Sequence, residues 1–236
     1  MPLLYLDDLT PGQRFAGSTR IRVEDSQIKT FAAEFDPQPF HLDESAASAS
    51  IFRGLAASGM SPGTSGNVSV RVGDEVRLSA SGTSLAALTA EQMARTTLDG
   101  TPVTEGDGPT PRPTKEWPLH LAMYARDPEY RCVVHLHSPS AVAASCLAPW
   151  REHTAFAPVT PYVVMRVGNV PLVRYAAPGD PAQAERVRGS ALRFHGALLQ
   201  NHGSIAAGRT VAEAVDRAIE IEEAARVRLL LGDRLD

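Results

Sequence analysis

Two histidines separated by one residue follow a short apolar run near the middle of the chain. His135 and His137 come directly after Val133 and Val134. An apolar run of this length is typical of a buried strand, in which alternate side chains point to the same face. We therefore expect both imidazoles on one face of the strand, with Leu136 turned back into the core. Two imidazoles placed in this way can share one metal ion.

A third histidine ends another apolar run. His202 follows Leu198 and Leu199 at a short distance, and it precedes Gly203. Three neutral imidazoles around an open position are a common way to hold a catalytic divalent metal. The chain contains only 7 histidines. Each one taken alone fits an ordinary core or loop position, but the pattern as a whole predicts a metal site.

A carboxylate is expected beside this metal site. Glu116 stands at the start of a predicted helix, where free N–H groups and the helix dipole favour a negative charge. His120 lies one turn later on the same helical face. A glutamate next to a three-histidine metal can be a fourth ligand, or it can move a proton at a carbon beside a metal-bound carbonyl. Without the histidines, Glu116 would be read as an ordinary helix-start residue.

Three short loops could bind an anionic group of a substrate. One loop precedes a predicted strand, one follows a strand and one begins a helix. Backbone N–H groups, hydroxyls and one ammonium together suit a phosphate. Each motif alone is also an ordinary turn. The candidate residues are Gly66, Asn67, Ser81, Gly82, Thr114 and Lys115.

Composition limits the other classes of function. The chain has 236 residues, 43% hydrophobic and 21% charged, which is ordinary for a globular protein with one full core. The net charge of -4 and the lack of a basic stripe argue against a nucleic acid partner. No apolar run reaches membrane-spanning length, and residues 1–8 do not read as a secretory signal. Two cysteines make no disulfide framework, so we expect a cytoplasmic protein without a membrane partner.

The composition and the predicted secondary structure change near residue 59. We therefore place a domain boundary between residues 1–59 and 60–236. Aromatic and acidic residues dominate the first part, and short strands with glycine-rich turns dominate the second. The last helix has the clearest signals, with a Thr210–Glu213 capping pair and an apolar face of Val211, Val215, Ile219, Ala225 and Leu229. We expect strands at 18–23, 68–70, 76–79, 163–165 and 170–173, and helices at 25–34, 43–57 and from 114 onward.

The motifs in this order and spacing resemble the class II aldolase/adducin family. The strings are Gly-Asn-Val-Ser-Val-Arg from Gly66, Ser-Gly-Thr from Ser81, Pro-Thr-Lys-Glu ending at Glu116, His-Leu-His-Ser from His135, and Asn-His-Gly around His202. The resemblance covers about residue 55 to the C-terminus. It implies an α/β protein, a three-layer α/β/α sandwich with a mainly antiparallel central sheet. It also implies a homotetramer with sites between subunits.

Residue by residue, the resemblance assigns the site. His135, His137 and His202 match zinc ligands, and Glu116 matches the catalytic acid/base, which can also approach the metal. The phosphate region of the family matches Gly66, Asn67, Ser81, Gly82, Thr114 and Lys115. Imidazole ligands also suit manganese or cobalt, so the sequence does not fix the native metal.

A subgroup of the family is also indicated. The strings Lys-Glu-Trp-Pro-Leu-His from Lys115, Thr-Pro-Tyr-Val-Val-Met from Thr160 and Pro-Gly-Asp from Pro178 resemble the 3-oxo-tetronate 4-phosphate decarboxylases. This resemblance implies a zinc-dependent carbon–carbon lyase that acts on a small phosphorylated sugar acid. It would give dihydroxyacetone phosphate through a metal-bound enediolate. Tyr162 is then the candidate proton donor, although a tyrosine packed at a strand start fits equally well.

Two other functions remain open from the sequence. A sugar-phosphate aldolase of the fuculose or ribulose phosphate type uses the same enediolate, so the metal ligands do not separate the two reactions. Lys115 favours the decarboxylase, because an ammonium could hold an extra negative group. A non-catalytic, adducin-like interaction protein would not need the three histidines and Glu116.

The first part of the chain resembles a different family. The segment 31–43 is similar to MaoC-like hot-dog dehydratases, with Asp36 and His41 where that family keeps a catalytic pair and Gln38 where asparagine is common. The fragment ends before the strands that would complete a hot-dog sheet, and an incomplete sheet with open edges cannot build that site. Our hypothesis is that helix 43–57 replaces the first helix of the aldolase domain, which deletion of residues 1–40 would test.

Overall fold

The computed structural model describes residues 44–104 and 111–232, together with isolated positions between 24 and 33. The strand expected at 18–23 lies outside the described residues. Of the helix expected at 25–34, the described positions 26, 27, 29, 30 and 33 are helical. Within the described ranges, no helix is both long enough and apolar enough to cross a membrane.

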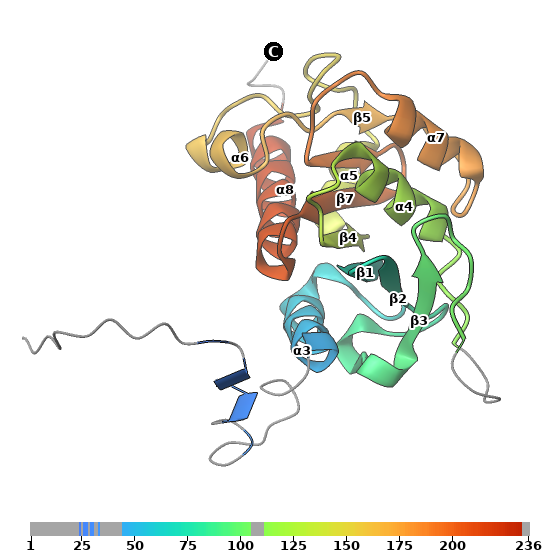
Figure 1. Ribbon diagram of the computed structural model, residues 1–236. Helices are drawn as coiled ribbons and strands as arrows, with labels where there is room; N and C mark the ends of the chain where they lie inside the picture. The colour runs from blue at the N-terminus through green and yellow to red at the C-terminus, as the bar shows by residue number, and fades with distance from the viewer. Residues whose placement is uncertain are drawn as a thin grey trace, which may run out of the picture.

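Seven strands form one sheet in the order β3-β2-β1-β4-β7-β6-β5 (Figure 1). All neighbouring strands pair antiparallel except β5 and β6, which pair parallel. The sheet is therefore mainly antiparallel, as predicted, with one parallel edge. The strands are β1 Asn67–Val72, β2 Glu75–Ser79, β3 Met93–Thr97, β4 Cys132–Leu136, β5 Leu172–Val173, β6 Gly196–Leu199 and β7 Gly203–Gly208.

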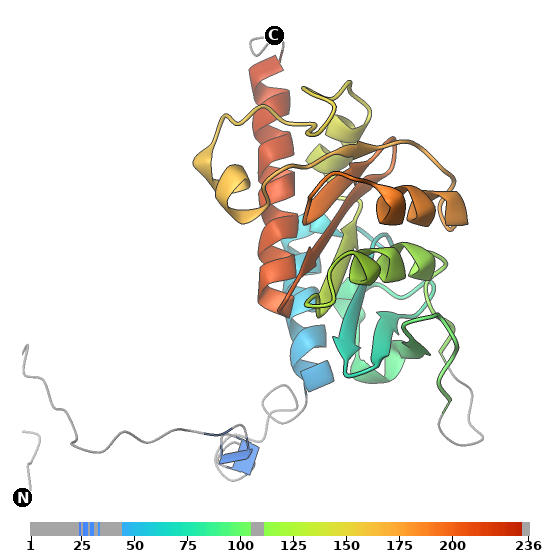
Figure 2. The ribbon, with the colours of Figure 1, turned by 45° about the horizontal axis from the view of Figure 1, so that its top comes forward.

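Helices cover both faces of this sheet (Figure 2). One face carries α4 Trp117–Arg126 and α7 Pro181–Gly189. The other face carries α3 Glu44–Leu55, α5 Pro139–Ser145 and α8 Val211–Leu231. The remaining helices are α6 Pro161–Arg166, the 3-10 turns η3 Leu85–Ala87 and η4 Ala90–Gln92, and the π-turn η2 Ala56–Met60. The three-layer α/β/α architecture is thus confirmed.

Alternation along the central strands divides the hydrophobic core into two clusters. On β4, Val133 packs with the α4 and α7 side, and Val134 packs with the α3, α5 and α8 side. On β7, Ile205 and Ala206 divide in the same way. A strand buried on both faces reads as a continuous apolar run, which explains the apolar run at 132–134. His135 shares the face of Val133, so its ring points toward the layer that contains α4.

Helix α3 is part of the core on one face of the sheet. Its residues Ala49 and Phe52 are almost fully buried in the cluster that also contains residues of α8. The expected helix 43–57 is therefore confirmed over Glu44–Leu55. Gly59 breaks the helical conformation inside the following turn η2, because its φ of +86° lies in the left-handed region that glycine tolerates. The domain boundary near residue 59 stays a prediction.

Two expected strands and one helix face need correction. Residues 163–165 lie in helix α6 rather than in a strand, because Thr160 and Pro161 start a helical turn and Val163 anchors it in the core. Only Leu172–Val173 of the segment 170–173 is a strand. On α8, the buried stripe runs instead through Ala214, Val215, Arg217, Ala218, Ile221, Ala224 and Ala225, and it leaves Ile219 and Leu229 exposed.

The start of α8 is capped by only half of the expected pair. The Thr210 hydroxyl accepts a hydrogen bond from the Glu213 N–H at 3.0 Å, as an N-cap residue should. The Glu213 carboxylate accepts from the Arg209 N–H and pairs with Arg217, rather than returning to the backbone of Thr210.

Candidate active site

The three histidines meet at one end of the neighbouring interior strands β4 and β7. His135 is in β4, His137 follows the end of β4, and His202 directly precedes β7. Antiparallel pairing places Leu136 opposite Ser204, so the end of one strand lies beside the start of the other. The three ring centroids are consequently 4.7 to 4.9 Å apart in every pair. The expected convergence of residues that are 65 positions apart in the chain is confirmed.

The backbone fixes the positions of two of the histidines. The Nδ1–H of His135 donates to the Ser204 carbonyl at 2.8 Å, so in the neutral ring Nε2 carries the lone pair. This Nε2 atom lies 3.0 Å from Nε2 of His137. His202 is placed by a turn in which Asn201 adopts a φ of +56°, a left-handed conformation that asparagine tolerates better than most residues.

Glu116 lies against the same group. It is the N-cap residue of α4, and its Oε2 is 3.2 Å from Nε2 of His135. Its other oxygen, Oε1, is 3.4 Å from Nε2 of His202. One ligand atom from each of Glu116, His135, His137 and His202 falls within 4.8 Å of all the others.

The polar atoms at this point fit a divalent cation. Among the described residues, Glu116 Oε1 and both ring nitrogens of His202 are buried without a hydrogen-bond partner. Buried polar atoms are nearly always paired, and unpaired ones signal a missing partner. Three imidazoles and one carboxylate form a donor set suited to zinc and neighbouring divalent metals. The four side chains can therefore hold a metal ion.

Burial and charge set the protonation of the group. Burial, together with the charge of His135, lowers the pKa of both His137 and His202 to about 4, so both rings are neutral ligands at neutral pH. Burial by itself raises the pKa of Glu116, but the charge of His135 and hydrogen bonds from His135 and Asn67 outweigh it and lower this pKa. Burial likewise opposes the charged form of His135, and Glu116 reverses this effect and raises the pKa of His135. Glu116 is thus an ionised carboxylate, ready to face a cation.

The three predicted anion loops lie side by side. The Ser81 N–H donates to the Arg112 carbonyl at 2.9 Å, and the Thr114 N–H donates to the Ser79 carbonyl at 3.1 Å. The Val68 N–H donates to the Ser79 hydroxyl, which joins the start of β1 to the end of β2. The structure therefore brings the loops at 66–67, 81–82 and 114–115 to the neighbourhood of Glu116.

The side chains of these loops are not equally available. Ser81, Gly82 and Lys115 are exposed. Thr114 is buried, and its hydroxyl accepts from the Glu116 N–H at 3.3 Å. The carboxamide of Asn67 is also buried, and it donates to Glu116 Oε2 at 2.8 Å. The exposed residues of these loops are free to meet an anion, whereas the side chains of Thr114 and Asn67 position Glu116.

Gly66 and Gly179 support these loops through close backbone contacts. A Cβ atom on Gly66, whose φ is +78°, would lie 2.9 Å from the His135 carbonyl oxygen. A Cβ atom on Gly179, whose φ is +85°, would lie 3.2 Å from the Lys115 carbonyl oxygen. The Pro-Gly-Asp string at 178–180 therefore packs directly on the loop of Lys115.

Tyr162 does not join the four-residue group within one chain. It is 60% exposed on α6, where it lines a hollow with Glu220 and Glu223 of α8. None of the four candidate ligands lines this hollow.

The residues that sequence analysis left without a role are Ser69, His120 and Tyr124. All three are buried, and hydrogen bonds connect them to Asn67 and thus to Glu116. A signal was available for two of them, because Glu116, His120 and Tyr124 recur at four-residue intervals along one helical face. The sequence contains no such signal for Ser69, because its contacts with His120 and Tyr124 depend on how α4 packs on β1.

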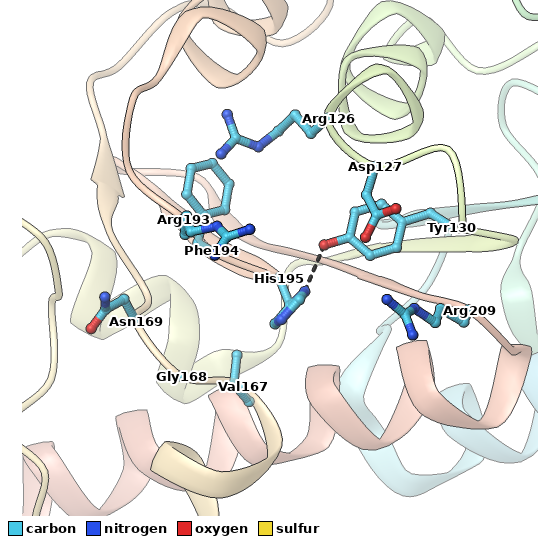
Figure 3. A pocket seen from close by; sticks show the side chains of 10 residues that line it. All are labelled: Arg126, Asp127, Tyr130, Val167, Gly168, Asn169, Arg193, Phe194, His195 and Arg209. Atoms are coloured by element: carbon cyan, nitrogen blue, oxygen red, sulfur yellow. Dashed lines mark hydrogen bonds between the residues drawn. The ribbon is translucent and has the colours of Figure 1, made fainter.

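A second hollow, of about 490 Å³, lies at the opposite ends of β4 and β7 (Figure 3). Tyr130 precedes β4, His195 precedes β6 and Arg209 follows β7, whereas the histidine group lies at the other ends of β4 and β7. Arg126 in this hollow donates to backbone carbonyl groups of Val187, Ser190 and Leu192. This hollow is therefore separate from the candidate active site.

Comparison with known proteins agrees with this fold. The sequence model of the family described as Class II Aldolase and Adducin N-terminal domain matches residues 46–229. The chain belongs to this family. A model described as MaoC like domain matches residues 8–81, so the resemblance of the first part is also confirmed. The two matches overlap at 46–81, and within that overlap the structure forms α3, β1 and β2 of the aldolase-type fold.

The curated relatives include two kinds of lyase. A 3-oxo-tetronate 4-phosphate decarboxylase of Pectobacterium atrosepticum is 40% identical over 177 residues, which cover 75% of this chain and 79% of the relative. A 5-methylthioribulose-1-phosphate/5-deoxyribulose-1-phosphate aldolase of Rhodospirillum rubrum is 33% identical over 73% of this chain and 74% of the relative. Among solved structures, YgbL of Escherichia coli has a TM-score of 0.74 at 34% identity, covering 80% of this chain and 90% of that chain.

Proposed function

We propose that this protein is a zinc-dependent carbon–carbon lyase that decarboxylates 3-oxo-tetronate 4-phosphate to dihydroxyacetone phosphate. One observation carries the proposal: His135, His137, His202 and Glu116 converge within 4.8 Å in the candidate active site. Relatives that bear the name of this decarboxylase, one of them 40% identical, support the choice of substrate.

The reaction places clear demands on the site. The bond between the carboxylate carbon and the α-carbon of the 3-oxo acid breaks, and carbon dioxide leaves. Its electron pair stays on the α-carbon and is delocalised onto the neighbouring ketone oxygen. A proton must then reach the α-carbon to give dihydroxyacetone phosphate. A divalent cation held by the four side chains supplies Lewis-acid stabilisation of this negative charge.

The chain's own residues supply orientation and the proton. The exposed residues Ser81 and Gly82 hold the phosphate, with Gly66, Asn67 and Thr114 completing the loops. The Lys115 ammonium attracts a second negative group, such as the substrate carboxylate. The Glu116 carboxylate, with one oxygen free of hydrogen bonds, is placed to hold or move a proton beside the metal position.

Tyr162 is proposed as the proton donor from a second copy in a homotetramer. It is exposed on α6, beside Val164 and Met165, which are 52% and 78% exposed. Exposed apolar residues around a tyrosine are typical of a surface that a partner covers. This arrangement would bring the Tyr162 hydroxyl to the metal group of a neighbouring subunit. Zinc as the native metal and a cytoplasmic location belong to the same proposal.

A sugar-phosphate aldolase is the second candidate function. The Rhodospirillum rubrum relative, at 33% identity, bears the name of such an enzyme. An aldolase breaks a bond to an aldehyde carbon and leaves the same kind of negative charge, so the metal ligands serve both reactions. An adducin-like interaction role finds less support, because it gives no reason to place four metal-binding side chains together.

The decisive experiment supplies purified zinc-loaded protein with 3-oxo-tetronate 4-phosphate, and separately with fuculose and ribulose phosphates. We expect equal amounts of carbon dioxide and dihydroxyacetone phosphate from the first substrate. E116Q should lower kcat by about 100-fold or more, because it removes the acid/base group. E129Q, which changes an exposed glutamate outside the site, is the matched control. Aldehyde release without carbon dioxide would instead establish the aldolase.

A further inference from the structure

A ladder of buried polar groups runs between α4 and β1. Glu116, His120 and Tyr124 occupy successive turns of the helix, and Asn67 and Ser69 occupy alternate positions of the strand. Asn67 donates to Glu116 Oε2 at 2.8 Å and lies 2.6 Å from His120 Nε2. The Ser69 hydroxyl lies 2.8 Å from His120 Nδ1 and 2.9 Å from the Tyr124 hydroxyl. Each rung thus joins the helix to the strand.

The hydrogen bonds of this ladder have one consistent direction. Because the Glu116 carboxylate only accepts, the Asn67 amide must donate to it and turn its carbonyl oxygen toward His120. His120 Nε2 therefore carries the proton, and its bare Nδ1 accepts from Ser69. Ser69 in turn is free to accept from Tyr124. The donors run from Tyr124 through Ser69, His120 and Asn67, and they end on Glu116.

The ladder lies in an apolar setting. Its members are at most 7% exposed, and their neighbours on α4 are Leu119, Leu121, Ala122 and Met123, all buried. Burying five polar side chains there is costly unless they are hydrogen-bonded, and each of the five makes at least one hydrogen bond within the ladder. Such a hydrogen-bonded buried network is rigid. An apolar helix–strand interface would provide packing with no such requirement, so packing alone does not account for the ladder.

The ladder treats the two oxygens of Glu116 differently. Oε2 accepts the Asn67 hydrogen bond and lies 3.2 Å from His135 Nε2, whereas Oε1 has no hydrogen-bond partner among the described residues and lies 3.4 Å from His202 Nε2. The terminal torsion of a glutamate has a broad energy minimum, so a carboxylate turns easily unless something holds it. A donor fixed on one oxygen fixes the direction of the other.

We infer that His120, with Asn67, Ser69 and Tyr124, is a positioning device that holds Glu116 by Oε2 and directs Oε1 toward the metal position. This inference rests on the proposed function for the chemistry of Glu116. His120 is a positioning residue in it, because the His120 ring acts only through Asn67. Partners of this kind behind a metal site change metal affinity or activity by about 10- to 100-fold when they are lost.

The test compares H120M with H120Q in the full chain. Methionine keeps a flexible apolar volume but has no donor, whereas the glutamine amide can still donate to the Asn67 oxygen. We expect H120M to lose about 10- to 100-fold in zinc affinity, measured by chelator competition, or in kcat, with little change in KM. H120Q should recover most of this loss. S69A should give a smaller loss in the same direction, because His120 then lacks its second partner.

L119V on the same helix is the control, since it changes apolar packing without touching the ladder. It should lower the unfolding midpoint and leave zinc affinity and the ratio of kcat to KM unchanged. The inference is overturned if H120M and H120Q have the same zinc affinity and kcat. It is also overturned if the loss of zinc affinity in every variant is proportional to its loss of stability. Zinc affinity is measured without substrate, so the ladder can be tested even if the proposed decarboxylation is not found.

Discussion

The Nε2 atoms of His135 and His137 lie 3.0 Å apart, although one ring belongs to β4 and the other follows its end. The Nδ1–H of His135 is already used by the Ser204 carbonyl. Both Nε2 atoms therefore turn toward one point, together with the unpaired nitrogens of His202. Two lone pairs at this separation repel each other unless a proton or a cation lies between them. The arrangement is the one expected of ligands that share a metal ion.

Removing one of these ligands should remove the metal. We expect H137Q to purify with much less than one zinc per chain and to bind added zinc at least about tenfold more weakly than the wild type. H153Q, which changes an exposed histidine outside the group, should keep full metal content. Elemental analysis of both variants checks this expectation. Chelator treatment of the wild type should abolish activity, and added zinc should restore it. A chelated protein with full activity would contradict the metal role.

Lys115 should separate the decarboxylase from the aldolase. The chain has only two lysines, Lys29 and Lys115, so K29M is a natural control for K115M. Loss of one charged hydrogen bond to the substrate carboxylate corresponds to about 1.5–3 kcal/mol. We therefore expect K115M to raise KM for 3-oxo-tetronate 4-phosphate by roughly tenfold or more. Sugar phosphates without a carboxylate should be affected much less. Equal effects on both substrates would place Lys115 on the phosphate instead.

Tyr162 offers a test of the site between subunits. We expect a particle of four times the 25.3 kDa chain mass in light scattering. Y162F and E116Q should each be nearly inactive, because one lacks the proton donor and the other the acid/base group. Mixed tetramers formed from the two variants should regain activity, since some sites then receive both intact residues. Mixtures that stay as inactive as their components would show that Tyr162 does not act across the interface.

The metal ligands could be predicted because strand periodicity is simple. His135 and His137 share a face by the two-residue repeat, and the apolar run before them shows that the strand is buried. The strand that pairs with β4 could not be predicted in this way. β7 pairs with β4 and so brings His202 beside His135 and His137. This pairing depends on the strand order of the sheet, which no local sequence pattern contains.

Other features depended on tertiary packing. Residues 163–165 read as a strand because β-branched residues favour extended backbone, yet one buried contact of Val163 and the Pro161 start are enough to hold a short helix. The contact between Ser69 and His120 likewise exists only because α4 lies on β1. Such pairings are decided by which faces meet in space, so the composition of each segment alone did not predict them.

Gly203 should be intolerant of any side chain. A Cβ atom at this position would overlap the Leu136 carbonyl oxygen, between the ends of β4 and β7. We expect G203A to lower the free energy of unfolding by about 1–3 kcal/mol, the usual range for overpacking, and to weaken metal binding through the adjacent His202. G189A has open space at the end of α7 and should be neutral or slightly stabilising. Denaturant unfolding of both variants measures the contrast, and equal stability would show that β7 can shift.

His120 should make the stability of the fold depend on pH. Burial, helped by the charge of His135, lowers the pKa of His120 to about 3 in the folded protein, against an ordinary value of 6.5. Between these values the unfolded chain binds a proton on His120 that the folded chain does not. Stability contributed by the neutral ring is therefore complete above pH 6.5 and is lost as the pH falls toward 3, by about 1.4 kcal/mol per pH unit.

The wild type and H120Q differ in this one titrating group. The contributions of the other histidines to the pH dependence of stability therefore cancel when the two proteins are compared. We expect the unfolding free energy of the wild type to fall more steeply than that of H120Q between pH 6 and pH 4. The difference between the two slopes should correspond to about one more proton taken up on unfolding by the wild type. Denaturant unfolding at several pH values, at equal metal content, gives both slopes. Parallel slopes would mean that His120 takes up a proton inside the folded protein, and the donor order from Ser69 through His120 to Asn67 would then be wrong.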